Sequence, residues 1–301
     1  MYQKFSLAAM MLAAPQGFDD WKYMEWTFFL YTLPIVFAFG IVIGSFLNVV
    51  IIRLPRGESL IKRSSHCMTC GTKIRVIDLI PIFSWLFLRG KCHSCGEKIS
   101  PRYPIVEALN GILYLADFLV FGWTWNTVVM CIFTSVLIVV GFMDWDTLEM
   151  DMRVLAMILV LVIPSWFVTE LTLKERLIGA VCIGLPFFLI GEISRPYAKK
   201  KTGEDVRGVE LGDTLLMTFA GLLLGWKAMV PSAFIGILLA ALFGMILKKK
   251  SGESKFALGP YLCMGLFIGA MFGEMLTDWY LSTLLPQPEI EEFYTNILTL
   301  R

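Results

Sequence analysis

Long apolar runs separated by short polar stretches are the dominant pattern along the 301-residue chain. A helix needs about 20 mostly apolar residues to cross a bilayer, and several runs approach or exceed that length. Proline and glycine mark most of the junctions between them. The pattern predicts an all-α polytopic membrane protein with about eight transmembrane helices. These helices are expected at about 27–52, 104–121, 126–143, 153–169, 177–193, 213–225, 228–247 and 258–284.

The composition agrees with a membrane protein, because 57% of the residues are hydrophobic and only 17% are charged. Soluble domains usually carry about 25% charged residues. The 213–225 run is short for a membrane span, so we expect it to extend through the following "GWKAM". Glycines four residues apart predict close contacts between helices. They are Gly40 and Gly44, Gly221 and Gly225, and Gly265, Gly269 and Gly273.

Basic residues predict the orientation. Ten Lys or Arg and only three acids lie from Arg53 to Arg102, and 195–207 and 248–255 are also basic. Such loops stay in the cytoplasm under the positive-inside rule, which places both termini outside. The predicted domains are an N-terminal tail (1–26), the first transmembrane helix (27–52), a cytoplasmic domain (53–103), a transmembrane core (104–284) and a C-terminal tail (285–301). The start of the chain only faintly resembles a signal peptide.

Two Cys-x-x-Cys-Gly motifs, "CMTCG" at 67–71 and "CHSCG" at 92–96, indicate a structural zinc site. Each motif places two thiolates on one tight turn, and four thiolates complete a tetrahedron. Disulfides or metal-free thiols are alternatives, although disulfides rarely persist in the cytoplasm. His66 and His93 flank the motifs and could replace a cysteine. The expected ligands are Cys67, Cys70, Cys92 and Cys95.

Carboxylates are the remaining candidates for catalytic residues. The chain has only two histidines, both beside the cysteines, and it contains no H-E-x-x-H motif. A histidine-dependent protease inside the membrane is therefore excluded. Asp144 ends the third predicted helix and Asp213 begins the sixth, so an even number of crossings places both on the same side. Such a pair can share a proton in aspartic proteolysis, and Gly212 would allow close backbone approach. Helix capping by both aspartates is the alternative.

Other chemically interesting residues are expected to serve packing. Glu107, Asp117, Glu192 and Glu274 lie within or beside apolar segments, where polar packing is the favoured interpretation. Three isolated cysteines are expected in helix cores: Cys131, Cys182 and Cys263.

The order of motifs resembles the bacterial type IV prepilin peptidases over roughly 35–275. The segments that match are "GSFLNVVIIRLPRGES", both cysteine motifs with "IDLIPIFSWLFLRGKC", "ISPRYPIVEALNG", the Asp144 segment, the Gly-Asp pair at 212–213 and "FALGPYLCMGLFIG". In the family pattern Asp144 matches the first catalytic aspartate, and Asp213 matches that of a Gly-x-Gly-Asp motif. Three positions depart from the pattern: Glu210 replaces the first motif glycine, Leu215 a frequent lysine, and Asp151 a usual proline.

This resemblance implies a membrane-embedded aspartic endopeptidase of the bacterial inner membrane. Its substrates would be prepilins or pseudopilins, whose basic leader is removed at the cytoplasmic face; its other contacts would be membrane lipid, and no nucleic acid is implied. Many bacterial members then methylate the new N-terminus with S-adenosylmethionine, and Glu107 and Asn48 are candidate polar contributors to that activity. A zinc-bearing scaffold of a pilus or secretion machine, or a proton-coupled transporter, are the competing hypotheses.

Acidic residues near the aspartate pair predict a site for the basic leader. Glu210 is best placed, three residues before Asp213, with Gly212 beside the dyad. The alternative is that these acids are solvated loop residues that balance nearby lysines. The other members of the group are Glu149, Asp151, Glu204 and Asp205.

Overall fold

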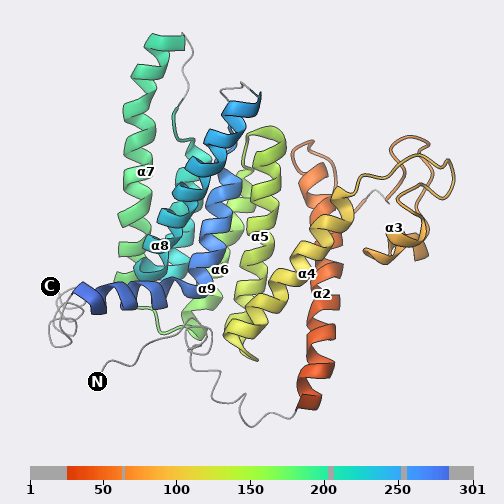
Figure 1. Ribbon diagram of the computed structural model, residues 1–301, viewed down its shortest axis with the longest axis horizontal. Coiled ribbons are helices and arrows are strands. Elements are labelled where there is room, and N and C mark those ends of the chain that lie inside the picture. The colour runs from red at the N-terminus through yellow and green to blue at the C-terminus, as the bar shows by residue number, and fades with distance from the viewer. Residues whose placement is uncertain (1–25, 63–64, 203–206, 252–255, 285–301) are drawn as a thin grey trace. The chain divides into compact units, whose positions relative to one another are not determined.

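The structure is a computed structural model that describes residues 26–62, 65–202, 207–251 and 256–284. Within these ranges the chain is helical and contains no strand. The chain separates into two compact units, 1–139 and 140–301, and the boundary lies inside helix α5 (Trp125–Thr147). Figure 1 labels the helices of both units.

The predicted all-α membrane protein is confirmed. Six helices of the described chain are long and apolar enough to cross a bilayer. Helix α6 (Met152–Val168), with 17 residues, is shorter. Helix α8 (Leu211–Ser251) is far longer than one crossing requires. It contains a break at Gly225, and division there restores the eight helical segments that the hydrophobic pattern predicts.

In the first unit, helices α2 (Trp26–Arg53) and α4 (Arg102–Phe121) pack against each other at glycines. A β-carbon added at Gly40 would lie 2.7 Å from Gly111 Cα, and one at Gly44 would lie 2.8 Å from Glu107 Cα. Asn110 Nδ2 donates a 2.7 Å hydrogen bond to the Gly40 carbonyl across this contact. The segment between the two helices carries a 3₁₀ turn, η2 (Ile77–Leu79), and a short helix, α3 (Phe83–Phe87).

In the second unit, α8 packs against α6, α7 (Leu173–Thr202) and α9 (Gly259–Leu284). Small residues lie at the α8–α9 contact as well: a β-carbon on Gly265 would lie 2.6 Å from Gly236 Cα, and one on Gly273 2.7 Å from Ala228 Cα. The prediction that the spaced glycines bring helices together is confirmed at these contacts. Lipid offers no hydrophobic drive for helices to associate, so close van der Waals packing must supply the attraction.

Helix α8 folds back on itself at Gly225, so our expectation that its first arm continues through "GWKAM" is wrong. Its first turn packs on Met150, as does Gly259 at the start of α9, so these ends lie together. Just past the break, Lys227 instead bonds Asp278 near the end of α9 (Nζ–Oδ1 3.1 Å). Gly225 has φ 73° and ψ 170°, a conformation open essentially to glycine alone.

A buried arginine joins three helices beside this break. Arg176 of α7 is 1% exposed. Its Nη1 donates to Ser165 Oγ of α6 and to the Leu222 carbonyl of α8, both at 2.9 Å. Its Nη2 donates to Thr169 Oγ1 at 2.8 Å. The guanidinium thereby satisfies carbonyl and hydroxyl oxygens near two helix ends that would otherwise lack donors.

We expect Gly225→Ala to destabilise the protein by about 1–3 kcal/mol, because alanine must adopt a strained backbone conformation there. The added β-carbon would also lie 3.0 Å from Leu171 Cδ2. The measurement is a thermal unfolding curve of the full-length protein in one detergent, and the midpoint should fall.

Gly244→Ala is the matched control on the second arm of α8. Its backbone is helical, and the added β-carbon would meet only the ring of Phe256, at 3.3 Å. A midpoint for Gly225→Ala equal to that of Gly244→Ala would contradict the importance of the break.

Candidate functional site

Asp144 lies in the last turn of α5 and is 6% exposed. Its Oδ2 accepts a 2.8 Å hydrogen bond from the backbone N–H of Gly259. Gly259 is the first residue of α9, where backbone N–H groups have no partner within the helix. The carboxylate therefore holds the start of α9 in place, and the positive end of the α9 dipole favours its negative charge.

Asp213 lies in the first turn of α8 and is 4% exposed. Its Oδ2 accepts a long, 3.3 Å hydrogen bond from the Glu210 backbone N–H. Its Oδ1 is buried and has no hydrogen-bond partner among the described residues. The charges of Asp213 and Asp144 interact, so the two side chains lie in one electrostatic environment. A buried carboxyl oxygen without a partner is unfavourable unless it carries a proton or meets another molecule.

Both aspartates do serve helix starts, as the capping alternative predicts. Asp213 bonds back to Glu210, one half of a capping box, and Asp144 bonds to the start of a different helix. Capping uses only Oδ2 of Asp213, however, and leaves Oδ1 without a role. Capping and chemistry are therefore compatible at this site.

Two residues to which sequence reasoning assigned no role fix the position of the pair. A β-carbon at Gly259 would lie 2.8 Å from Asp144 Oδ2 and 2.5 Å from Met150 Cε, so only glycine fits there. A β-carbon at Gly212 would lie 3.1 Å from Met150 Cβ. Met150 therefore packs between the starts of α8 and α9. The Gly-Pro pair at 259–260 is the sequence signal for such a helix start.

Glu210 fits its place in the motif without strain. The non-glycine residues with positive φ in the described chain are Ile82, Arg89 and Leu148, so the backbone at 210 is open to any residue. Its carbonyl accepts the first helical hydrogen bond of α8, from Thr214. Partial desolvation, followed by the nearby charge of Glu149, raises the pKa of the exposed Glu210 carboxyl.

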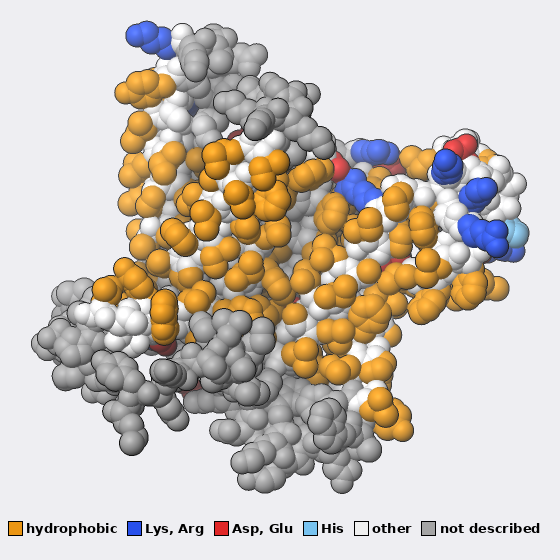
Figure 2. Space-filling model, in the orientation of Figure 1, with side chains coloured by type: hydrophobic (Ala, Val, Ile, Leu, Met, Phe, Trp, Pro, Cys, Tyr) orange, Lys and Arg blue, Asp and Glu red, His pale blue; other side chains and the backbone are white. Residues whose placement is uncertain are grey.

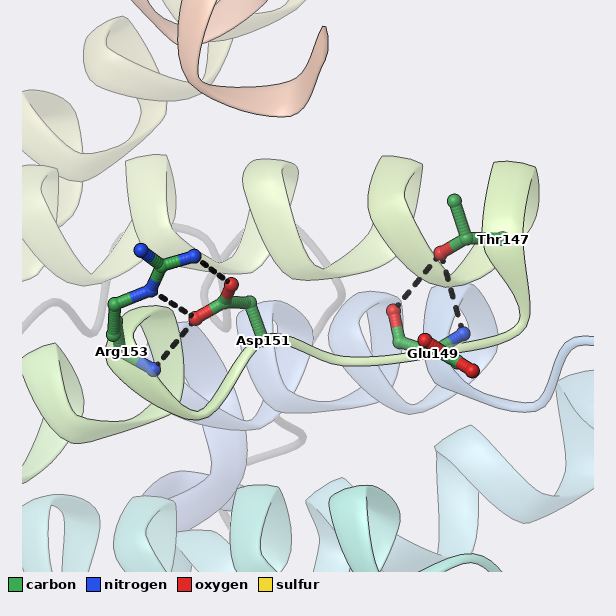
Figure 3. Close-up of polar contacts among 4 residues, drawn as sticks. All are labelled: Thr147, Glu149, Asp151 and Arg153. Carbon is green, nitrogen blue, oxygen red and sulfur yellow. Dashed lines mark hydrogen bonds and ion pairs between the residues drawn. The ribbon is translucent and has the colours of Figure 1, made fainter. Parts of the chain in front are cut away.

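The loop between α5 and α6 contains two local polar pairs, drawn in Figure 3. Asp151 caps α6 by accepting from the Arg153 backbone N–H at 2.8 Å, and its carboxylate also pairs with the Arg153 side chain at 2.6 Å. This pairing lowers the pKa of Asp151. Thr147 Oγ1 donates to the Glu149 carbonyl at 3.2 Å. Because its charge is already paired, Asp151 is a poorer candidate than Glu149 for binding a basic leader.

The four cysteines of the two motifs come together in the first unit. Their sulfurs all lie within 4.8 Å of one another, and Cys67 and Cys95 Sγ are 3.9 Å apart. Tetrahedral zinc with bonds of about 2.3 Å places its sulfurs about 3.8 Å apart. All four are free thiols, and neither histidine belongs to the group within the described residues. The site fits one metal ion held by Cys67, Cys70, Cys92 and Cys95.

The two halves of this site have the same backbone design. The N–H of Gly71 bonds the Cys67 carbonyl, and that of Gly96 bonds the Cys92 carbonyl, both at 2.9 Å. Both glycines have positive φ, 69° and 73°, which the tight turn requires. The Thr72 hydroxyl, 3.3 Å from Cys70 Sγ, lowers the pKa of that thiol to about 6.

The remaining acids have varied surroundings. Glu107 is buried, and its Oε2 accepts from the Ile82 N–H at 2.7 Å. Asp117 is buried with Oδ2 unpartnered among the described residues. Glu192 pairs with Arg207, which agrees with a packing role, whereas Glu274 is exposed.

Two further residues correct or extend the expectations. Cys182 is exposed, so its assignment to a helix core is wrong, because it lies on the outer face of α7. Asn48 is buried and its Nδ2 donates to the Tyr103 carbonyl at 3.1 Å. Glu204 and Asp205 lie outside the described residues.

Comparison with known proteins identifies the family. A model described as the Bacterial Peptidase A24 N-terminal domain matches residues 38–121, and one described as the Type IV leader peptidase family matches 131–245. The chain belongs to the type IV leader peptidase family. As a member it is a peptidase, and its apolar helices make it a multi-pass membrane protein.

The chain aligns with several curated relatives over nearly the whole length of each relative. A protein of Aeromonas salmonicida (strain A449) is 30% identical over 87% of this chain and 97% of its own. One from Neisseria gonorrhoeae is 32% identical over 79% and 90%, and one from Bacillus subtilis (strain 168) is 28% identical over 84% and 99%. Each is named prepilin leader peptidase/N-methyltransferase. No solved structure matches the chain.

We expect one metal ion per chain, zinc being the ion that four thiolates in a tetrahedron typically hold. Metal binding should supply much of the folding free energy of this small segment. Elemental analysis of protein purified under reducing conditions without chelator measures the content, and Cys67→Ser should lower it strongly.

Cys182→Ser is the matched control, since Cys182 is an exposed thiol outside the group. Metal-free wild-type protein, or equal metal loss in both variants, would contradict the assignment.

Proposed function

We propose that this family member cleaves the basic leader from type IV prepilins or pseudopilins as an aspartic endopeptidase, with Asp144 and Asp213 as its catalytic pair. The observation that carries the proposal is the buried, unpartnered Oδ1 of Asp213 beside a second buried carboxylate. Two interacting carboxylates at helix starts can hold one proton between them. The names of the curated relatives supply the substrate class.

The surroundings of each aspartate favour a division of roles. The Gly259 N–H and the α9 dipole stabilise a charged Asp144, which can take a proton from water. The resulting hydroxide oxygen attacks the scissile carbonyl carbon. Asp213 is the better proton carrier, because a protonated carboxyl could donate from its unpartnered oxygen to the carbonyl oxygen. The proton on Asp144 then passes to the leaving amine as the C–N bond breaks, and a hydroxyl of the tetrahedral intermediate returns its proton to Asp213, which leaves the new carboxyl group.

We place this site on the cytoplasmic side of a bacterial inner membrane. The support is the basic character of 53–102, 195–207 and 248–255, which the positive-inside rule assigns to the cytoplasm. Asp213 follows the second of these segments, and Gly259 follows the third. A prepilin enters the membrane from the same side, so its scissile bond would lie at the depth of the pair.

Methylation of the new N-terminus with S-adenosylmethionine is a second proposed activity. Its support is the name that the relatives share, together with two buried polar residues of the first unit, Asn48 and Glu107. Both side chains already bond backbone groups, Asn48 to Tyr103 and Glu107 to Ile82. These bonds favour a packing role for the two residues, and the activity itself is tested by mass spectrometry below.

For the leader, we propose that Glu210 and Glu149 receive its Lys or Arg side chains. Both are exposed, their charges interact, and the charge of Glu210 also acts on Asp144. Two neighbouring carboxylates repel each other, and a cation bound between them is attracted to both. Gly212 lies two residues after Glu210 and next to Asp213. It packs against Met150, and without a side chain it leaves the backbone there accessible.

We expect Asp144→Asn and Asp213→Asn each to lower cleavage by about 10³-fold, because an amide can neither take nor give the proton. Purified protein is incubated with a prepilin, with and without S-adenosylmethionine, and the products are weighed by mass spectrometry. Cleavage yields the shortened pilin, and methylation yields a product heavier by one methyl group.

Asp146→Asn is the matched control, since Asp146 is an exposed acid on the same turn as Asp144. Unfolding curves show that each variant is folded. Undiminished cleavage by both aspartate variants would contradict the mechanism, and absence of cleavage by the wild type would favour the scaffold or transporter hypothesis.

We expect Glu210→Gln to raise KM for a basic-leader substrate about 2- to 5-fold with little change in kcat, the size typical of an exposed ion pair. The raised pKa of Glu210 means that its charge is lost at a higher pH than usual as the solution is acidified. The wild-type KM should therefore rise on the acidic side, and this rise should be weaker in Glu210→Gln.

A substrate whose leader charges are replaced by glutamine is the matched comparison. Equal effects of Glu210→Gln on both substrates would show that Glu210 acts on the fold or on the aspartate pair instead.

A further inference from the structure

The segment 76–87 of the first unit exposes an unusual number of large apolar side chains. Val76 and Phe87 are each 84% exposed, although the segment lies between the two cysteine motifs. Soluble surfaces rarely leave such a patch uncovered. Figure 2 shows apolar side chains gathered on one side of this part of the molecule. We name it the apolar segment; its exposed members are Val76, Ile77, Leu79, Ile80, Phe83, Leu86 and Phe87.

The depth of the apolar segment follows from its bond to a membrane helix. Glu107 Oε2 accepts from the Ile82 N–H at 2.7 Å. Glu107 is five residues into α4, about 7 Å along the axis from Arg102 at 1.5 Å per residue. Its side chain leans back toward the helix start, so Ile82 lies between the level of Arg102 and that of Glu107. This is the headgroup–acyl boundary of a bilayer that α4 spans.

Many backbone N–H groups of the apolar segment are bonded within the protein, as an apolar environment demands. The N–H groups of Asp78, Leu79 and Ile80 bond carbonyls three residues back. Those of Ser84 and Leu86 bond carbonyls four residues back. Ile82 has a positive φ, and its N–H donates to the Glu107 carboxylate. Unsatisfied backbone groups are costly in lipid, so this pairing favours immersion.

The apolar side chains cannot turn inward to form a core. Trp85 Nε1 donates to the Ile99 carbonyl at 3.1 Å, and Gly90 packs directly under its indole ring. Together with the Ile82–Glu107 bond, these contacts fix the inner side of α3. The outer side carries Phe83, Leu86 and Phe87. Ile105 of α4 is likewise exposed and apolar at nearly the depth of Glu107, so α4 presents an apolar side chain to its surroundings at this level.

Basic residues border the apolar segment on both sides. The stretch 73–91 carries four Lys or Arg and one acid. Lys73 and Arg75 precede the apolar residues, and Arg89 and Lys91 follow them; all four are exposed. Arg75 is paired with Asp78 at 2.7 Å, so Lys73, Arg89 and Lys91 supply the positive charge of this border. An apolar face with a basic border is typical of segments that lie in the interface of an anionic membrane.

We propose that the apolar segment is an interfacial membrane anchor, which inserts into the leaflet at the Arg102 end of α4 and uses its basic border to bind anionic lipid headgroups. The anchor fixes the four-cysteine site at the membrane surface. It rests on contacts within the first unit and does not depend on the peptidase mechanism. A second copy of the chain and the apolar helix of a substrate are the competing occupants of this surface.

The experiment places photoreactive benzoylphenylalanine at Phe87 in the full-length protein, reconstituted in vesicles of phosphatidylethanolamine and phosphatidylglycerol. Met68 is the matched control, an exposed apolar residue on the first cysteine motif, and Ile112 of α4 is the lipid-facing reference. After illumination, mass spectrometry should find at least about fivefold more lipid adduct at Phe87 than at Met68, as expected for immersion by 5–10 Å. Lipid adduct at Phe87 no higher than at Met68, or crosslinks to a second chain or to added prepilin in place of lipid, would overturn the proposal.

The basic border is tested by Arg89→Gln combined with Lys91→Gln. The double variant should lower the Phe87 adduct severalfold in the anionic vesicles and leave it unchanged in vesicles of phosphatidylcholine alone. Equal yields for wild type and variant in the anionic vesicles would overturn the assignment of anionic headgroups. Both proteins must bind equal amounts of metal, which shows that the cysteine site remains folded.

Discussion

Close contact between helices at small residues is the constraint on which this structure depends. In lipid, helices are not driven together by the hydrophobic effect, so they must approach closely enough for dispersion forces to act over long contacts. Gly221 lies against Gly179, and Gly265 lies against Gly236, where any side chain would overlap backbone. These contacts pack α7 against the first arm of α8 and α9 against the second arm. They hold together the bundle in which Asp144 and Asp213 are buried.

The same contacts explain why acidic side chains can be buried in this protein. A helix start presents free N–H groups and a positive dipole end, and both stabilise carboxylates. Asp144 uses the start of α9, and Asp213 uses the start of its own helix. Of the two carboxyl oxygens of Asp213, Oδ2 has a partner, and Oδ1 is buried without one among the described residues. Asp117 Oδ2 of the first unit is in the same state, but only Asp213 also feels the charge of Asp144.

The first unit contains a segment around four cysteines that needs other contacts to hold it in place. Its four-cysteine site contains too few residues to build a hydrophobic core, and a metal ion bound there, together with the hydrogen bond to α4, would stand in for one. Glu107 links this segment to the membrane helix through Ile82. The sequence marks Glu107 as a buried acid and as a candidate for methylation, whereas the structure shows that it ties the segment between the cysteine motifs to α4. The exposed apolar residues of α3 are consistent with a segment whose solvent is partly lipid.

The sequence by itself determined the helical membrane class, the four cysteines that gather, and the two aspartates worth considering, because these depend on hydropathy, motif spacing and residue type along one chain. It predicted a reversal between the spans 213–225 and 228–247, but not that a single backbone conformation at Gly225 makes it. Nor did it assign roles to Gly259 and Met150, since their importance lies in contacts between segments that are far apart along the chain. The tertiary structure alone decided which oxygen of Asp213 lacks a partner and which side chains α3 exposes, because hydrogen bonding and burial are properties of neighbours that the chain brings together only on folding.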